Sequence, residues 1–338
     1  MGRLKGLLSG IALSCVVVLL FLLAGEAYLS RHYHNERERI AARAPGRDLC
    51  TMASPFPELI YTRVPGKCDT NSHGFRDTEH GYEKPDGVFR IVIIGDSVAE
   101  GQGVPLRDVF GKVLERQLHA LTAEGGRDVE VIILAQSGYS TSQELFLLEH
   151  AAFRYAPDLI VWSYVLNDPA HPVYHDSNGE LGRYYFEPVL HTAHFVARKL
   201  FEISERIKSI DCGREYHTLL HCAYWEEVQA NIRTIAALSR QRQVPAIFVI
   251  FPVLEDGENF DHYSLAPVHA RLAAAASAAG LPVVDELDAF RAYPPGSLSL
   301  PLASGHDPLH PNATGHRIAA QHLYDYIVAG GYLDSPSP

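Results

Sequence analysis

From Arg90 onward, short apolar runs alternate with longer stretches in which apolar residues recur every three or four positions. The short runs have the length and β-branched composition of buried strands, and the longer stretches have the period of amphipathic helices. The predicted strands are Arg90–Gly95, Val129–Ala135, Asp158–Tyr164, Ala246–Phe251 and Pro282–Asp285. The predicted helices are Val109–Leu121, Gln143–Arg154, Trp225–Gln241, Ala266–Ala279 and Thr314–Val328. Asn312 is expected to cap the last of these helices.

This alternation is typical of βαβ units, whose parallel strands are covered by helices on both faces. The sequence therefore predicts a three-layer α/β/α sandwich around a parallel, flavodoxin-like sheet, in a domain that spans residues 88–330. The alternation stops between residues 169 and 223, where Tyr, His and Phe are frequent. We expect this segment to be an insertion that lies over the ligand-binding edge of the sheet as a lid or a substrate wall.

An uncharged apolar run extends from Gly6 to Gly25. A helix of this length can cross the hydrocarbon core of a bilayer. A signal peptide is the alternative, because Gly25-Glu26-Ala27 offers a small-residue cleavage site. The run is long for the apolar part of a signal peptide, so we favour an uncleaved transmembrane helix within residues 1–29. Residues 30–87 are then a juxtamembrane linker and an irregular segment.

The spacing of the cysteines helps to predict the cellular compartment of the domain. Cys15 lies within the apolar run, and the other four form two local pairs, Cys50 with Cys68 and Cys212 with Cys222. Such pairs suit disulfides in an oxidising compartment, although four independent thiols have the same spacing. Basic residues after the apolar run favour a cytoplasmic body, but this rule is weak for long translocated domains. We therefore expect a membrane-anchored protein whose domain is periplasmic or extracellular.

The net charge and the motifs argue against several classes of partner and cofactor. The formal net charge of −11 and the absence of a basic stripe argue against nucleic acid as a partner. The cysteine spacing matches neither a zinc finger nor a CxxC motif. The glycine-rich turn at Gly101 and Gly103 lacks the lysine of a phosphate-binding loop. No metal and no cofactor is therefore expected.

Two separated motifs carry candidate chemistry. Ser97 follows the first predicted strand in the run Gly95-Asp96-Ser97, and Asp307-Pro-Leu-His310 lies near the end of the chain. A nucleophilic serine needs a base to accept its proton, and the base needs an acid to orient it. Ser97, His310 and Asp307 can fill these three roles. Each motif also has a simpler interpretation, because Ser97 alone is typical of a helix cap and Asp307–His310 of a loop entering the last helix.

Gly138 and Asn167 follow the second and third predicted strands. In parallel sheets, ligands bind beyond the carboxyl ends of the strands, so both residues are expected at the same edge as Ser97. Taken singly, Gly138 is compatible with an ordinary turn, and Asn167-Asp168 with an Asx-turn at the end of a strand.

Together these motifs resemble the four blocks of the SGNH/GDSL hydrolase family, in the same order and over roughly Phe89 to Val328. The blocks are Gly95-Asp96-Ser97, Ser137-Gly138, Asn167-Asp168 and Asp307-x-x-His310. The resemblance implies an oxyanion hole made by the backbone N–H groups of Ser97 and Gly138 and the side-chain amide of Asn167. One departure is Val165, which stands where the family usually has glycine.

The resemblance also implies an activity, namely hydrolysis of carboxylic esters through an acyl-Ser97 intermediate without metal or cofactor. The preferred substrates are O-acyl or O-acetyl groups on a glycan or a lipid. An O-acyltransferase that uses the same triad and a non-catalytic binding or scaffold protein are the alternatives. Asn71–Arg76 resembles a segment that precedes the catalytic domain in some membrane-anchored members, and we expect it to pack against the edge of the domain.

Overall fold

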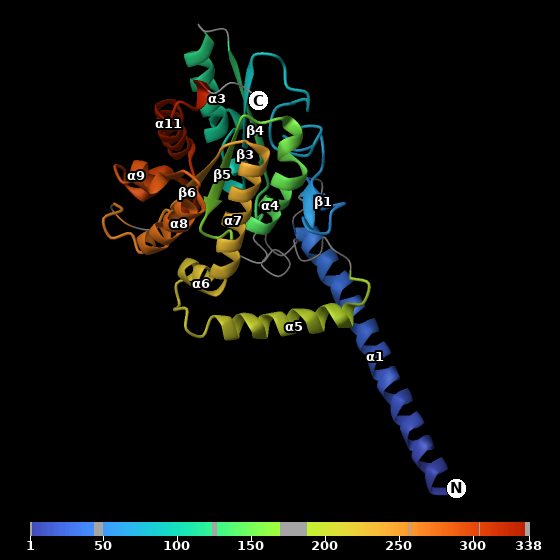
Figure 1. Cartoon of the computed structure of the whole chain (residues 1–338). Coiled ribbons are helices and arrows are strands. Elements are labelled where there is room, and N and C mark those ends of the chain that lie inside the picture. Colours follow the sequence, from blue (N-terminus) through green and yellow to red (C-terminus); the bar gives the residue numbers. More distant parts are fainter. Residues whose placement is uncertain are drawn as a thin grey trace.

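A parallel sheet of five strands forms the centre of the protein (Figure 1). The computed structural model describes residues 2–43, 50–123, 127–169, 188–255, 257, 259–303 and 305–334. The strands of the sheet are β3 (Val88–Gly95), β4 (Asp128–Ala135), β5 (Leu159–Val165), β6 (Ala246–Phe251) and β7 (Val283–Asp285). Their order, β4-β3-β5-β6-β7, is that of flavodoxin-like folds. Strands β3, β5 and β6 are buried at every position, which explains their nearly continuous apolar sequences, broken only by Arg90 and Ser163.

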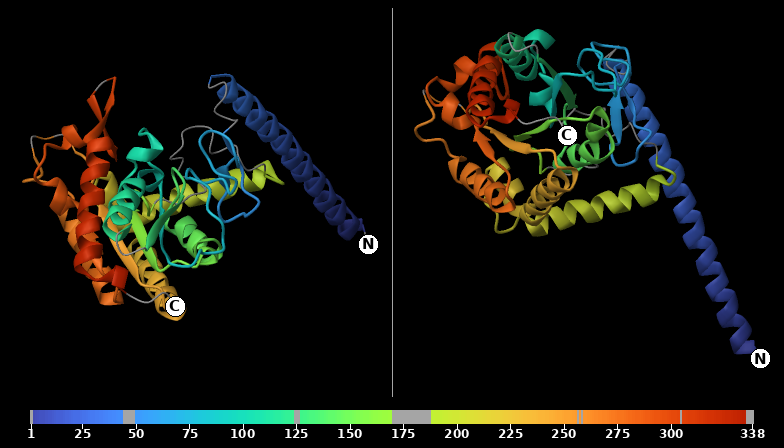
Figure 2. Two further views of the ribbon diagram at one scale, coloured as in Figure 1. Left: turned by 90° about the horizontal axis from the view of Figure 1, so that it is seen from above. Right: turned by 45° about the horizontal axis from the view of Figure 1, so that its top comes forward.

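Helices cover both faces of this sheet (Figure 2). On one face α3 packs against α11, and on the other α7 packs against both α4 and α8. These helices are α3 (Phe110–Thr122), α4 (Thr141–His150), α7 (Trp225–Arg242), α8 (Ala266–Ala279) and α11 (Ala313–Ala329). The predicted three-layer α/β/α sandwich with a parallel, flavodoxin-like sheet is confirmed. The main difference lies after α4, where a separate 3-10 turn (Ala152–Tyr155) follows a helix that was predicted to continue to Arg154.

Shorter elements complete the described part of the chain. Near the carboxyl edge of the sheet lie α2 (Ser97–Glu100), α6 (Tyr216–Ala223), α9 (Glu286–Phe290) and α10 (Pro295–Leu298). Two antiparallel pairs, each of two strands, lie outside the main sheet: β1 (Thr51–Ala53) with β2 (Tyr61–Arg63), and β8 (Ser299–Leu302) with β9 (Gly305–Pro311). Asn312 caps α11 as predicted, because its Oδ1 accepts hydrogen bonds from the N–H groups of Thr314 (2.8 Å) and Gly315 (3.1 Å).

The N-terminal helix α1 (Gly2–Arg43) projects away from the sandwich (Figure 1). It is long and apolar enough to cross a membrane, with a mean hydropathy of 2.3 in its most apolar window. The large apolar side chains from Ile11 to Leu23 are exposed. The helix continues past residue 29 into the predicted linker. The described part of the predicted insertion contains α5 (His191–Lys208) and α6, whereas residues 170–187 lie outside the described residues.

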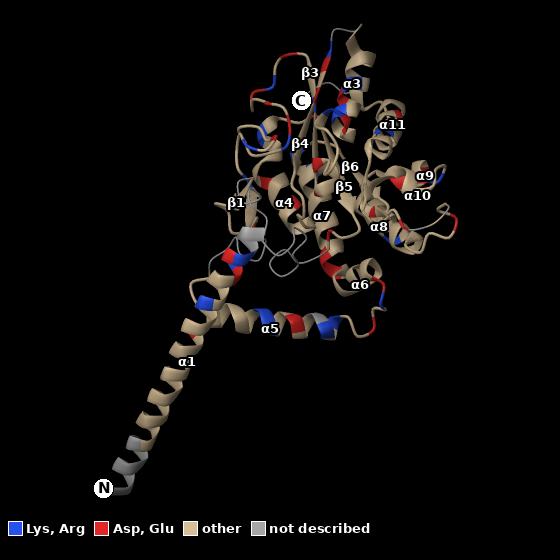
Figure 3. Cartoon of the chain, turned by 180° about the vertical axis from the view of Figure 1, so that it is seen from behind, with Lys and Arg blue, Asp and Glu red and all other residues tan. Residues whose placement is uncertain are grey.

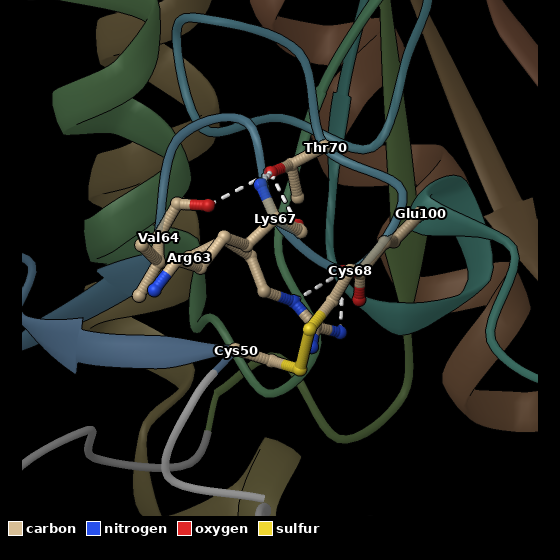
Figure 4. The surroundings of a disulfide bond; sticks show 7 residues. All are labelled: Cys50, Arg63, Val64, Lys67, Cys68, Thr70 and Glu100. Carbon is tan, nitrogen blue, oxygen red and sulfur yellow. Dashed lines mark hydrogen bonds and ion pairs between the residues drawn. A yellow bond between two sulfur atoms is a disulfide. The ribbon is translucent and has the colours of Figure 1, made fainter. Parts of the chain in front are cut away.

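Both predicted cysteine pairs are disulfide-bonded. Cys50–Cys68 closes the segment that carries the β1–β2 pair, and beside it Arg63 of β2 reaches Glu100 of α2 (Figure 4). Cys212–Cys222 links the loop after α5 to α6. The first disulfide therefore stabilises the segment that brings Arg63 to the sandwich.

A buried histidine between α3 and α11 predicts a loss of stability in acid. Burial, reinforced by the charges of Arg76 and His310, lowers the pKa of His316 to about 3. In an unfolded chain a histidine binds its proton below about pH 6.5. The unfolded state therefore takes up more protons as the pH falls from 6.5, and the stability that neutral His316 provides above that pH is progressively lost.

We expect His316→Gln to flatten this dependence, because glutamine can still accept the hydrogen bond from the N–H of Phe110 but does not titrate. Urea unfolding of the full chain in detergent at pH 7 and pH 5 measures the difference. The fall in unfolding free energy should be smaller in the variant by up to about 1.4 kcal/mol per pH unit. An unchanged fall in the variant would contradict the assignment to His316.

Candidate active site

Ser97 lies at the carboxyl end of β3. The strand order changes direction at β3, since β4 is added on one side of it and β5 on the other. Asp96 caps the short helix α2, since its Oδ1 accepts a hydrogen bond from the N–H of Val98 (3.0 Å). Gly101 ends α2 with a positive φ of 77°, which a residue with a side chain adopts only under strain. The sharp strand-to-helix turn places the Ser97 side chain at the edge of the sheet, 7% exposed.

The three residues predicted as a triad meet at this edge. The Ser97 Oγ lies 2.9 Å from Nε2 of His310, and His310 Nδ1 lies 2.7 Å from Oδ2 of Asp307. These partners assign the proton on Nδ1 to the bond with Asp307, which leaves Nε2 to accept the hydroxyl proton of Ser97. Asp307 and His310 both lie on β9, whose pairing with β8 fixes them opposite the end of β3.

Asp307 is held as a carboxylate. Burial opposes its ionisation, but hydrogen bonds from the N–H of Leu309 (2.9 Å) and from the ring and the N–H of His310 outweigh it. Together they keep the pKa of Asp307 below its ordinary value. A permanent negative charge beside Nδ1 stabilises a protonated His310, so this pair can accept a proton from Ser97.

Asn167 contacts the residue that precedes Ser97. Its Nδ2 is 3.5 Å from Oδ2 of Asp96, an oxygen that also lies 3.2 Å from the Ser97 Oγ. Asp168 closes the turn after β5, because its Oδ2 accepts the N–H of Val165 (2.8 Å) and its own N–H donates to the Val165 carbonyl (3.0 Å). Valine in place of the family's glycine is therefore compatible with a turn that presents Asn167.

Gly138 follows β4, which lies beside β3 in the sheet. Its φ of 79° lies in the left-handed region that favours glycine. The preceding residue is held in place, since the Ser137 N–H donates to Oε2 of Glu100 (2.8 Å). The structure thus brings Gly138 to the same edge of the sheet as Ser97 and Asn167.

Three buried carboxyl groups lie behind Ser97. They are Asp96, Glu144 of α4 and Asp168. Burial raises the pKa of each of them, and for Glu144 and Asp168 the neighbouring acids raise it further. The Trp162 Nε1–H donates to Oε2 of Glu144 (2.8 Å). The bond of Trp162 with Glu144 links β5 to α4 beneath the site.

The sequence reasoning missed the residues that support the loop after Ser97. Glu100 is 1% exposed and accepts two hydrogen bonds from Arg63, at 2.9 Å and 2.7 Å. Arg76 donates to the carbonyl groups of Glu100, Gly101 and Val104. The only sequence signal was the segment Asn71–Arg76, which packs against the domain as expected. Its arginine holds the turn that carries Ser97.

The neighbouring histidine, His306, is turned away from Ser97. Its Nε2 lies 3.0 Å from the carbonyl oxygen of Leu254. His310 is therefore the imidazole in contact with the serine. Among the described residues, no group of three or more His, Cys, Asp or Glu side chains is arranged to hold a metal ion.

Comparison with known families decides the class of this site. The model of the GDSL-like lipase/acylhydrolase family matches residues 93–318, more than half of the chain. The chain belongs to this family. As an SGNH-type serine esterase it is an ester hydrolase, and the matched region contains Ser97, Gly138, Asn167, Asp307 and His310. A comparison with curated protein sequences found no match.

Several solved structures are similar to this esterase. The acetyl xylan esterase AlAXEase is 13% identical with a TM-score of 0.43, covering 71% of this chain and 100% of that one. A catalytic mutant of Axe2, an acetylxylan esterase from Geobacillus stearothermophilus, is 14% identical with a TM-score of 0.45, covering 71% and 94%. LAE5, an alpha/beta hydrolase enzyme from the metagenome of Lake Arreo, Spain, is 18% identical with a TM-score of 0.46, covering 75% and 99%. The name acetyl xylan esterase describes the substrates of AlAXEase and Axe2 and not those of this chain.

Proposed function

We propose that Ser97, His310 and Asp307 form the catalytic triad of this esterase. The supporting observation is the continuous chain of hydrogen bonds from Asp307 through His310 to Ser97. His310 takes the hydroxyl proton through Nε2 while Oγ attacks the ester carbonyl carbon. The protonated ring then gives this proton to the leaving alcohol, and an acyl-Ser97 ester remains. Water attacks that ester with His310 again as base, and the carboxylic acid is released.

The oxyanion of each tetrahedral intermediate is proposed to lie among the N–H groups of Ser97 and Gly138 and the side-chain amide of Asn167. The positions of these residues at the ends of three neighbouring strands support this role. Such donors act mainly on the transition state, because the negative charge on oxygen develops only as the intermediate forms.

Asn167→Ala tests the oxyanion hole. We expect kcat to fall about 10²–10³-fold with a much smaller change in KM, because the amide hydrogen bond is made to the developing charge. Steady-state kinetics with p-nitrophenyl acetate measures both constants. A matched control is Asn231→Ala on α7, an asparagine outside the proposed triad and oxyanion hole. A fall in Asn167→Ala confined to KM would contradict the role.

We propose that the domain lies outside the cytoplasm and that α1 anchors it to a membrane. The two disulfides and the exposed apolar helix support this location. The proposed substrates are O-acyl or O-acetyl groups on a glycan or lipid of the cell envelope. Hydrolysis by the full chain in detergent, across acyl-chain lengths and acetylated glycans, identifies the preferred group. Transfer of the acyl group to an added sugar in place of water would instead identify an acyltransferase.

A further inference from the structure

The helix α5 turns its apolar side chains away from the protein. Val196, Leu200, Ile203 and Ile207 recur at the spacing of a single helical face. Each is more than half exposed, from 53% at Val196 to 64% at Ile207. Ile210, just beyond the helix, extends the same row and is 74% exposed. A contiguous apolar face of this kind marks an interaction surface.

The opposite face of α5 is more polar and less exposed. His194, Arg198 and Phe201 on this face are half-buried, so it carries one apolar side chain between two polar ones. A helix that covers a soluble domain has the reverse arrangement, with its apolar face buried and its polar face in water. The apolar face of α5 therefore matches a partner outside the sandwich.

The start of α5 is tied to α1 just past the uncharged run. Both carboxylate oxygens of Glu26 accept backbone N–H groups from the first turn of α5, those of His191 and Thr192, each at 2.8 Å. The His191 ring also contacts Tyr33 edge-on at 5.1 Å. A carboxylate at a helix N-terminus stabilises the helix. Because Glu26 directly follows Gly25, a membrane-spanning α1 would hold α5 at the level of the membrane surface.

The direction and charge of α5 fit the same surface. It runs crosswise to α1, between the sandwich and the free N-terminal part of α1, beyond the carboxyl ends of the strands (Figures 1 and 2). Its charged residues are banded along it (Figure 3). Counted from the sequence, α5 contains Arg198, Lys199, Arg206 and Lys208 against Glu202 and Glu205, so four positive minus two negative charges give +2 in a chain of −11. Lys199, Arg206 and Lys208 are exposed, whereas Arg198 lies on the opposite face. Exposed cationic side chains on a helix with an apolar face are typical of helices that bind anionic lipid.

We propose that α5 lies in the membrane–water interface, with Val196, Leu200, Ile203 and Ile207 inserted into a bilayer that contains anionic phospholipid. This inference rests on the membrane anchoring proposed above for α1. With both helices in place, the carboxyl edge of the sheet faces the bilayer. Ser97 is then presented to esters carried at the membrane surface rather than to esters in bulk water.

Site-specific fluorescence of the full chain in vesicles tests this arrangement. An environment-sensitive label is attached at Leu200→Cys on α5 or at Leu121→Cys on α3, each with Cys15 replaced by serine. Leu121 is an exposed leucine (47%) on α3, a helix at the opposite end of the sandwich, and is the matched control (Figure 1). The vesicles contain phosphatidylcholine and phosphatidylglycerol, with or without spin-labelled lipid. We expect lipid quenching at position 200 to exceed that at 121 several-fold, and iodide quenching to be several-fold weaker.

Two results would overturn the proposal. Equal iodide access at positions 200 and 121 would show that the apolar face of α5 stays in water. Shielding of position 200 from both iodide and spin-labelled lipid would show that protein, such as a second copy of the chain, covers it. A label on Cys15 of α1 tests the membrane anchor separately from the interfacial position of α5. Lipid quenching there without quenching at 200 overturns the interfacial helix alone, whereas no quenching at either position overturns the anchor as well.

Discussion

Replacing Ser97 with alanine is expected to abolish ester hydrolysis almost completely, with kcat falling by about 10⁴-fold or more. The variant loses the oxygen that lies 2.9 Å from Nε2 of His310, and no acyl-enzyme can form. Alanine is a good helix former, so the variant keeps α2 and the capping of this helix by Asp96. Hydrolysis of p-nitrophenyl acetate and covalent labelling by a fluorophosphonate measure the loss, and the label should be absent from the variant.

A second serine gives a matched control for this experiment. Ser163 of β5 is buried beside Gly95, and within the described part of the chain its hydroxyl has no hydrogen-bond partner. Ser163→Ala therefore removes the same atom near the site and should leave kcat close to that of the native chain. Combining Ser97→Ala with His310→Ala should cost little more than either change alone, because the two residues act as a unit. A Ser97→Ala variant that keeps a tenth of the native rate would refute the role of Ser97 as nucleophile.

The arrangement of the sandwich could be predicted from sequence because its strands are buried on both faces. Such strands appear as nearly unbroken apolar runs, and the helices between them show a clear period, so most boundaries agree within two residues. The hairpin of β8 and β9 could not be found in this way. Its strands contain Pro301, Pro308 and Pro311, and their pairing has an irregular register between Ser299 and Pro301. Asp307 and His310 therefore lie on a strand that has no apolar alternation.

The candidate site could likewise be predicted only in part. Ser97 and Asn167 follow buried strands, so the topology alone places them at one edge of the sheet. The residues that support them come from far away in sequence. Arg63 and Arg76 reach the loop of Ser97 from the segment before the first strand of the sheet. The segment Asn71–Arg76 was expected to pack against the domain, but nothing in the sequence indicated that Arg76 or Arg63 would contact this loop. The ion pair of Arg63 with Glu100 and the hydrogen bonds of Arg76 to backbone carbonyl groups depend on tertiary contacts, which hydrophobic periodicity does not encode.

The structure also explains why α5 was not predicted as a helix covering the sheet. Its hydrophobic period is clear, but its flanking sequence is rich in Tyr and His, and it interrupts the strand–helix alternation. In the structure it packs against α1 rather than against the sheet. The segment was expected to be a lid or substrate wall, and the described residues of α5 instead suit the interfacial role proposed above.

Changing Asp307 to asparagine is expected to lower kcat by about 10⁴-fold even though the shape of the side chain is kept. Oδ1 of Asp307 accepts the N–H groups of Leu309 and His310, so the one oxygen of asparagine must remain there. The amide NH₂ then faces Nδ1 of His310 in place of Oδ2. Two donors cannot share a hydrogen bond, so His310 must carry its proton on Nε2. A protonated Nε2 cannot accept the proton of Ser97.

Asp285 provides the matched control for this change. It also accepts a hydrogen bond from a histidine ring, since its Oδ1 lies 2.8 Å from Nδ1 of His269, and it caps α9. Asp285→Asn should therefore alter a similar pair while leaving kcat within a few-fold of the native value. Steady-state kinetics of both variants, with circular dichroism to verify folding, gives the comparison. If Asp307→Asn and Asp285→Asn retained similar activity, the tautomer of His310 would not control the reaction, and the role assigned to Asp307 would be wrong.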